Sequence, residues 1–317
     1  MDTMKTPIAS ARKTDVNLDV NIGGFRMPNP VTVASGTFAA GREYGDFIDV
    51  SALGAITTKG VSLNGWAGND GVRIAETASG MLNSIGLQNP GVAHLMETDI
   101  PWLAEHGARC IVNVSGHSFD EYVAVIEALE KSPDIGAYEV NISCPNVDAG
   151  GMTIGTQPDS VRQVVTLCRA ATKRPLIVKL TPNVTDITEI ATAAVEAGAD
   201  ALSLINTLLG MAIDTRTRRP VLGRAVGGLS GPAVKPVALR MVWEVGKAVD
   251  VPIVGMGGIR TGEDAIEFML AGATAVAVGT ANFGDPTASI DVLNGIITYC
   301  EDNGVKDIHE IIGGLQW

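Results

Sequence analysis

The feature that most restricts the fold of this chain is a regular alternation of short apolar runs with longer segments of helical periodicity. Eight apolar runs occur, at residues 31–35, 54–58, 110–115, 137–142, 176–181, 201–206, 252–257 and 274–280. Most are apolar at consecutive positions, which is typical of parallel strands buried on both faces of a sheet. The alternation therefore predicts eight parallel strands with helices between them.

Amphipathic segments separate these runs. Residues 119–132 place apolar side chains on one helical face, and residues 185–199 begin with Thr185, which we expect to cap the helix. Eight strand–helix units in a chain of 317 residues fit a (β/α)8 TIM barrel. An open doubly wound sheet is the alternative, although no GxGxxG fingerprint opens the chain.

The chain shows no linker that would divide it. We expect a single barrel domain over residues 17–317, preceded by a polar, flexible extension at residues 1–16 that lacks the apolar core of a signal peptide. No apolar run is long enough for a membrane helix. The net charge of −12 disfavours a nucleic-acid binder, which needs clustered lysine and arginine.

The four cysteines form no CxxC pair, so the sequence predicts neither a metal site nor an iron–sulfur cluster in this chain. Scattered thiols in a chain of this length favour a reducing, cytoplasmic compartment. Burial in the core is the ordinary fate of a free cysteine. Cys144 differs from the others because it follows the fourth apolar run, at Asn141, where a thiolate could act as a base.

Chemistry in such barrels takes place at the carboxyl ends of the strands. Glycine turns follow the last two predicted strands, at residues 256–259 and 278–280, and their backbone N–H groups favour a phosphate. Lys59 and Lys179 end two other strands and favour an anionic or electron-rich ligand, although each could instead pair with a carboxylate. Asparagines at further strand ends suit a pyrimidine-like ring, although any one of them could be a turn residue.

Several long blocks resemble the dihydroorotate dehydrogenase family, and its NAD-linked class (1B) in particular. The blocks are ASGTF, TTKG, NSIGLQNPG, VNISCPN, GGMTIGTQP, VKLTPNVTDI, LINTLLGM, GGLSGPAVKPVALRMV, PIVGMGGI and VAVGTANF. The resemblance covers nearly the whole chain from about residue 17. It implies the barrel fold and an FMN cofactor.

The resemblance also implies which residues contact the ligands. The residues that match FMN contacts of the family are Ser35, Lys59, Gly60, Asn113, Asn141, Lys179, Ile205, Gly231, Gly257, Gly258, Gly279 and Thr280. Those that match substrate contacts are Lys59, Asn83, Ser84, Ile85, Gly86, Leu87, Asn141, Asn146, Asn206 and Thr207.

The mechanism that the resemblance implies is the oxidation of dihydroorotate to orotate in pyrimidine biosynthesis. Cys144 removes a proton from C5 of the substrate while hydride leaves C6 for N5 of FMN, and Lys179 stabilises the charge gained by the flavin. Electrons then pass to NAD through a partner subunit that carries FAD and a 2Fe–2S cluster. The family further implies a homodimer at the core of a heterotetramer.

Other functions stay open at this point. The chain could belong to the fumarate-linked class (1A), or to the FMN barrel enzymes that act on dihydropyrimidines or dihydrouridine. It could also be a non-catalytic barrel that binds a nucleotide. The arginine-rich loop at residues 214–228 is expected to be a solvated basic face, with docking as the alternative.

Overall fold

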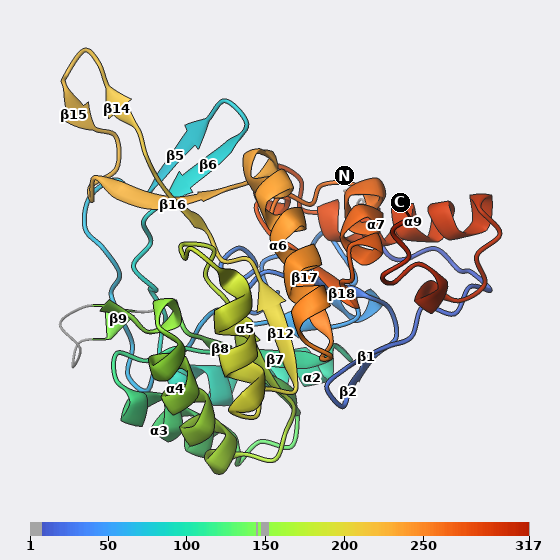
Figure 1. Cartoon of the computed structure of the whole chain (residues 1–317), viewed down its shortest axis with the longest axis horizontal. Helices are drawn as coiled ribbons and strands as arrows, with labels where there is room; N and C mark the ends of the chain where they lie inside the picture. The colour runs from blue at the N-terminus through green and yellow to red at the C-terminus, as the bar shows by residue number, and fades with distance from the viewer. Residues whose placement is uncertain (1–7, 144, 147–151, 317) are drawn as a thin grey trace, which may run out of the picture.

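The central element is an eight-stranded parallel sheet, seen in a computed structural model that describes residues 8–143, 145–146 and 152–316 (Figure 1). Every predicted strand is present. In spatial order the strands are β3 (Val31–Val33), β18 (Ala275–Val278), β17 (Ile253–Met256), β12 (Ala201–Leu204), β11 (Leu176–Lys179), β8 (Ile135–Asn141), β7 (Cys110–Val114) and β4 (Ile56–Thr57).

The sheet curls until its two end strands meet. The hydroxyl of Thr32 in β3 donates to the carbonyl of Ala55 at 2.9 Å and lies 3.1 Å from the hydroxyl of Thr57 in β4. The backbone N–H of Gly54 donates to the carbonyl of Val31 at 2.8 Å. These contacts nearly close the cylinder, so the (β/α)8 barrel is confirmed and the open sheet is excluded.

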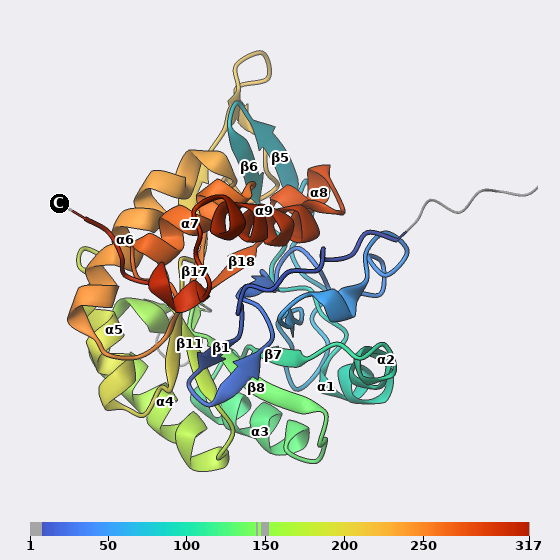
Figure 2. The same cartoon turned by 90° about the vertical axis from the view of Figure 1, so that its right-hand side faces the viewer.

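Helices form the outer layer of the barrel (Figure 2). The longer ones are α3 (Phe119–Leu129), α4 (Pro158–Ala171), α5 (Ile187–Glu196), α6 (Lys235–Ala248), α7 (Gly262–Leu270) and α9 (Ala288–Asp302). The shorter turns are η1 (Val50–Ala52), α1 (Val92–His94), η2 (Leu95–Asp99), α2 (Ile100–Glu105), η3 (Ile154–Thr156), η4 (Pro232–Val234), α8 (Ala281–Gly284) and η5 (Ile308–Glu310). Across the described ranges, none of these helices combines the length and the apolar character needed to cross a bilayer.

A hairpin covers the amino-terminal end of the barrel. It consists of β1 (Val20–Ile22) and β2 (Phe25–Met27), whose apolar side chains are buried. Glycine is required where the hairpin and the barrel meet, because a Cβ atom on Gly136 of β8 would lie 2.1 Å from the Phe25 ring. This end of the barrel is therefore filled, and only the opposite end is free to bind a ligand.

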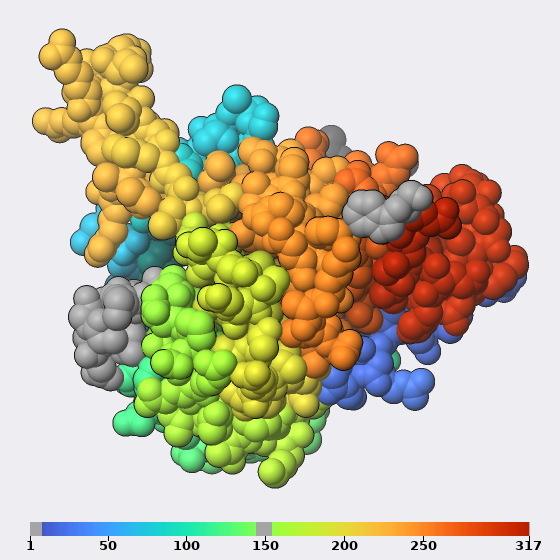
Figure 3. Space-filling view, in the orientation of Figure 1, coloured from blue at the N-terminus to red at the C-terminus, as the bar shows by residue number. Residues whose placement is uncertain are grey.

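A second, antiparallel sheet stands over the carboxyl-terminal end of the barrel, and the sequence did not predict it. Its strands are β13 (Leu208–Met211), β16 (Val226–Ser230), β6 (Gly80–Asn83) and β5 (Ile74–Thr77). The hairpin of β14 (Ile213–Asp214) and β15 (Arg219–Pro220) projects beyond this sheet as an arm (Figure 3). A short pair, β9 (Pro145–Asn146) and β10 (Met152–Thr153), lies at the same end of the molecule.

The described part of the amino-terminal extension, residues 8–16, is bound to the barrel. The backbone N–H of Arg12 donates to Asn294 Oδ1 at 2.9 Å, and its guanidinium pairs with Glu301 of α9. The hydroxyl of Thr14 donates to the same carboxylate at 2.9 Å. Residues 8–16 therefore have polar partners on α9 that lie far away in the sequence, and the expected flexibility of residues 1–16 stays a prediction. Residues 1–7 lie outside the described part.

The amino-terminal cap of α5 differs by one residue from the predicted cap. The side chain of Asp186, and not that of Thr185, accepts the backbone N–H of Thr188 at 2.8 Å. The helix begins at Ile187, so Asp186 occupies the capping position with extended backbone angles. A capping side chain must reach the second or third N–H of the helix, and Thr185 lies one residue too early to do so.

We predict that Asp186→Ala lowers the midpoint of thermal unfolding by a few degrees, whereas Thr185→Ala leaves it unchanged. The hydrogen bonds from Thr188 lower the pKa of Asp186. Its contribution is therefore complete above the ordinary aspartate pKa of about 3.9 and is lost as the pH falls through the lowered value. Thermal melts at neutral and acidic pH should show the difference between wild type and Asp186→Ala narrowing with acidification. A larger effect of Thr185→Ala would contradict this assignment.

Candidate functional site

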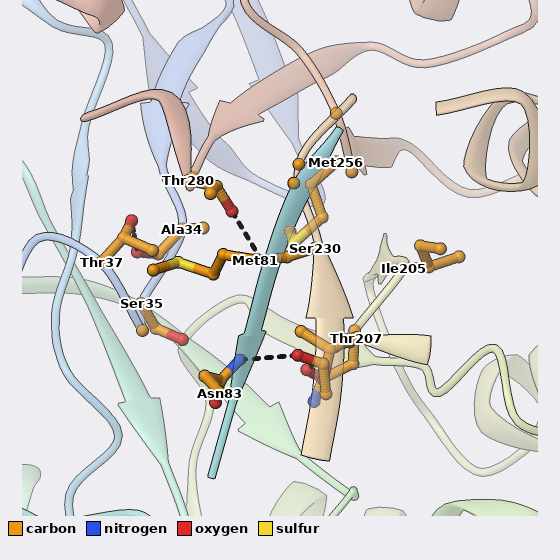
Figure 4. A pocket seen from close by; sticks show the side chains of 18 of the residues that line it. Ala34, Ser35, Thr37, Met81, Asn83, Ile205, Thr207, Ser230, Met256 and Thr280 are labelled. Carbon is orange, nitrogen blue, oxygen red and sulfur yellow. Dashed lines mark hydrogen bonds between the residues drawn. The ribbon is translucent and has the colours of Figure 1, made fainter. Parts of the chain in front are cut away.

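One pocket of about 990 Å³ opens at the carboxyl-terminal end of the barrel, beneath the antiparallel sheet (Figure 4). Nearly all of the residues that the sequence singled out line it. They are Ser35, Lys59, Gly60, Asn83, Ser84, Ile85, Gly86, Leu87, Asn113, Asn141, Lys179, Ile205, Asn206, Thr207, Gly231, Gly257, Gly258, Gly279 and Thr280. The strand ends and the loops after them therefore converge as the barrel geometry requires.

For two of the predicted site residues, the structure does not say whether the side chain lines the pocket. Cys144 lies outside the described residues. Asn146 belongs to β9, which pairs with β10, and only its backbone is described. Their proposed roles therefore stay predictions that rest on the sequence.

Directly beneath the floor of the pocket, which Asn113 and Lys179 line, lies a buried carboxylate that the sequence analysis missed. Glu139 lies within β8 and is only 3% exposed. Its Oε1 accepts a hydrogen bond from Asn113 Nδ2 at 2.6 Å, and its Oε2 accepts one from the Ser203 hydroxyl at 2.8 Å. The ammonium of Lys179 lies 3.6 Å from Oε1 and 3.4 Å from the hydroxyl of Ser35. Four strands thus meet at one charged group.

Side-chain alternation explains why this carboxylate points inward. Glu139 and Asn141 are two residues apart in β8, so both face the barrel interior, in successive layers. Tyr138, the residue before Glu139, faces outward instead, and its hydroxyl donates to Glu130 on the helical side. Glu139 is the one charged residue in the apolar run at 137–142, and this interruption could have indicated an inward-facing polar group.

Amide side chains gather above this floor. Asn206 Nδ2 donates to Asn141 Oδ1 at 3.3 Å, and the backbone carbonyl of Asn141 accepts the buried hydroxyl of Tyr122 at 2.6 Å. Asn83 Nδ2 donates to the carbonyl of Gly228 in β16 at 3.2 Å. A Cβ atom on Gly228 would lie 2.1 Å from the hydroxyl of Thr207, so glycine lets the roof approach this cluster.

At the end of the pocket away from the amide cluster, glycine turns expose backbone groups. Gly257 and Gly258 follow β17 with φ of 122° and 85°, which favour glycine. A Cβ atom on Gly258 would lie 2.8 Å from Cβ of Lys235 and 3.0 Å from the carbonyl of Gly231. The Thr280 hydroxyl donates to Ser230 at 2.8 Å across the same end (Figure 4). Turns of this kind at the last two barrel strands can hold a phosphate group.

Lys235 supports this turn from behind. Its ammonium lies 2.6 Å from a carboxylate oxygen of Asp264 and 2.9 Å from one of Glu267. Two hydrogen bonds raise the pKa of Lys235, and the bond to Asp264 has a larger effect than the bond to Glu267. The residue therefore stays cationic and joins the start of α6 to α7, which fixes the position of the glycine turn.

Three buried polar atoms lack a hydrogen-bond partner within the part of the chain that the structure describes. They are Asn113 Oδ1, Ser115 Oγ and Ser143 Oγ. Asn113 and Ser143 line the pocket. The Asn113 amide donates to Glu139 through Nδ2, so Oδ1 remains as an acceptor. A buried acceptor without a partner is unfavourable by about 1–3 kcal/mol, which favours a ligand with an N–H or O–H donor at this point.

The other cysteines are structural. Burial raises the pKa of both Cys110 and Cys168 to about 12, and it also raises the pKa of Cys300. All three are buried free thiols and none lines the pocket. No group of three or more histidine, cysteine or acidic side chains suited to a metal ion occurs within the described ranges.

Comparison with known proteins connects this pocket to a family. Residues 17–299 match the family model described as dihydroorotate dehydrogenase. A protein of Alkaliphilus metalliredigens named "Dihydroorotate dehydrogenase B (NAD(+)), catalytic subunit" is 57% identical over 302 residues, which are 95% of this chain and 100% of the relative.

Two further relatives bear the same printed name. The protein of Alkaliphilus oremlandii is 58% identical over 299 residues, which are 94% of this chain and 99% of the relative. The protein of Bacteroides thetaiotaomicron is 54% identical over 300 residues, which are 95% of this chain and 99% of the relative. With this identity over nearly the full chain, and with the barrel and its strand-end pocket, the chain belongs to the dihydroorotate dehydrogenase family.

Proposed function

We propose that this chain is the catalytic subunit of an NAD-linked dihydroorotate dehydrogenase, which oxidises dihydroorotate to orotate with bound FMN. Members of the family are oxidoreductases that act on a CH–CH group, and this chain shares that class. The observation that carries the finer proposal is the single pocket in which glycine turns, a buried lysine and an amide cluster lie together.

The residues of the pocket fit FMN. The glycine turns at Gly257–Gly258 and Gly279–Thr280 offer backbone N–H groups to a phosphate, and a Cβ atom on Gly258 would meet Lys235 and Gly231 and shift its turn. Asn113 Oδ1 is a buried acceptor that requires a donor, and the flavin ring carries N–H groups. Lys179 is 5% exposed as a residue, and its ammonium would suit the side of the ring that gains negative charge on reduction. When bound, FMN supplies the acceptor for a hydride.

The amide cluster fits the pyrimidine substrate. Dihydroorotate carries a carboxylate and alternating C=O and N–H groups. Asn83, Asn141 and Asn206 supply both donors and acceptors, and Lys59, which also lines the pocket, supplies a positive charge. The antiparallel roof brings Asn83 and Thr207 toward the barrel, which would restrict the orientations of the bound ring.

Cys144 is proposed as the base that removes the proton from C5 of the substrate. The support comes from the sequence, since Cys144 directly follows Ser143, and both Asn141 and Ser143 line the pocket. A thiol held close to a substrate carbon can serve as a proton acceptor without a metal ion.

We further propose a partner subunit that carries FAD and a 2Fe–2S cluster and passes electrons to NAD. The relatives are named as catalytic subunits of an enzyme that uses NAD(+), which supports a second component. A homodimer of this chain at the core of a heterotetramer is part of the same proposal.

The first prediction from the proposed function concerns the cofactor and the substrate together. We expect the purified chain to be yellow, and its visible flavin absorbance to bleach when dihydroorotate is added without air. Dihydrouracil at the same concentration should bleach it far more slowly, because it lacks the carboxylate that Lys59 would bind. A colourless protein with no affinity for FMN would overturn the proposed function, and faster bleaching by dihydrouracil would overturn the substrate.

The second prediction concerns the base. Cys144→Ala should lower turnover of dihydroorotate about 100-fold or more, with flavin absorbance retained, because general base catalysis is lost. Cys168→Ala is the matched control, since Cys168 is buried in α4, away from the pocket. Steady-state rates of the two variants, each loaded with FMN, provide the measurement. Equal rates in wild type and Cys144→Ala would refute the role of the thiol.

The third prediction concerns the phosphate end. Gly258→Ala should weaken FMN binding about tenfold or more, because the added methyl group meets Lys235 and Gly231 and shifts the turn that donates to the phosphate. Gly304→Ala is the control, since Gly304 also has a positive φ (69°) but nothing lies within 4 Å of its Cβ position. Titration of the apoproteins with FMN, followed by flavin fluorescence, measures both affinities. A normal affinity in Gly258→Ala would place the phosphate elsewhere.

A further inference from the structure

Glu139 is the one buried carboxylate among the described residues, it contacts Asn113 and Lys179 of the pocket lining, and the proposed mechanism gives it no role. We infer that Glu139 is a positioning residue that orients the amide of Asn113 and balances the charge of Lys179 in the pocket that would hold FMN. This inference rests on the proposed function, because it concerns the same pocket and its cofactor.

The orientation of Asn113 follows from its hydrogen bond. Glu139 offers only acceptor oxygens when ionised, so the group 2.6 Å from Oε1 must be the NH₂ of the Asn113 amide. The amide oxygen is thereby turned away from the carboxylate and has no partner within the described part of the chain. Without Glu139 either end of the amide could face the pocket. The carboxylate thus makes Asn113 an acceptor toward the ligand.

The charge of Lys179 is the second consequence. Its side chain is 7% exposed, and that of Glu139 is 4% exposed. Burying an ion away from water is strongly unfavourable unless an opposite charge and further hydrogen bonds compensate it. At 3.6 Å, Glu139 is the carboxylate that faces Lys179 across the barrel interior, while Ser203 and Asn113 complete the hydrogen bonds of the carboxylate. The pair together is neutral.

Because the charges of Glu139 and Lys179 cancel, this pair favours the reduced, negatively charged cofactor less strongly than Lys179 alone would. The ring gains negative charge on reduction, which the ammonium of Lys179 stabilises and the carboxylate of Glu139 opposes. Both effects are large in an interior of low effective dielectric constant. The arrangement therefore sets the reduction potential of the bound flavin below the value that Lys179 alone would give.

A purely structural role makes a different prediction. If Glu139 only joined β7, β8, β11 and β12 through hydrogen bonds, its replacement would lower stability without moving the potential. Glu139→Gln preserves the size of the side chain and removes the charge. We expect its bound flavin to have a more positive midpoint potential than wild type. The ratio of reduced to oxidised flavin should rise at least tenfold at a given poise, which is about 30 mV for a two-electron couple.

The experiment equilibrates the FMN-loaded proteins with redox dyes and reads the flavin spectrum. Glu130→Gln is the matched control, because Glu130 accepts hydrogen bonds from Tyr138 and Thr172 on the outer side of the barrel. Its potential should equal that of wild type. Titration of apoprotein with FMN provides a second readout, in which Glu139→Gln but not Glu130→Gln should bind more weakly, because the Asn113 amide is no longer held in one orientation.

A second pair of proteins keeps the test informative if Glu139→Gln alone does not fold. Lys179→Met leaves a buried carboxylate and should lower the potential, whereas Glu139→Gln/Lys179→Met leaves no charge and should return it toward wild type. The difference between these two proteins measures the effect of Glu139 even if Glu139→Gln alone does not fold. Suppose that the wild-type protein binds FMN and is bleached by dihydroorotate. A midpoint potential that is unchanged or more negative when Glu139 is replaced would then overturn this inference alone. Wild-type protein that binds no FMN overturns the proposed function and, with it, this inference.

Discussion

Closure of the parallel sheet is the constraint on which the rest of the structure depends. Once β3 and β4 meet through Thr32 and Thr57, all eight strands run in one direction around a single axis. Their carboxyl ends must then share one rim, and residues as distant in the chain as Ser35 and Thr280 line one pocket. The β1–β2 hairpin fills the other end, so the polarity of the barrel decides where a ligand can bind.

The interior of the barrel is less apolar than its strands suggest. Asn113, Glu139, Lys179 and Ser203 are each at most 5% exposed, and desolvation opposes the burial of every one of them. Their mutual contacts offset this penalty, with the carboxylate as the shared partner of the other three. Buried charges are seldom retained for stability alone. Two members of the network, Asn113 and Lys179, line the pocket, so the network joins the barrel interior to the place where a ligand can bind.

The roof of the pocket illustrates how insertions complete a barrel site. The loops after β4 and β12 each supply two strands, which pair into the antiparallel sheet over the barrel. Glycine at positions 227 and 228 keeps β16 close to the carbonyl of Asn83 and the hydroxyl of Thr207. Sequence patterns failed here because these strands are short, rich in glycine and paired between segments more than a hundred residues apart.

The sequence alone determined the eight strands and the rim. Strands buried on both faces must be apolar at consecutive positions, and the polar residues that end them are visible as interruptions of those runs. Tertiary structure alone decided the rest. Whether Glu139 faces the pocket or the helices depends on its register with Asn113 and Ser203, and Arg12 is held by a helix nearly three hundred residues away. Local sequence patterns determine the periodicity of each strand and helix. The register between strands and the contacts between distant residues arise only when the sheet closes.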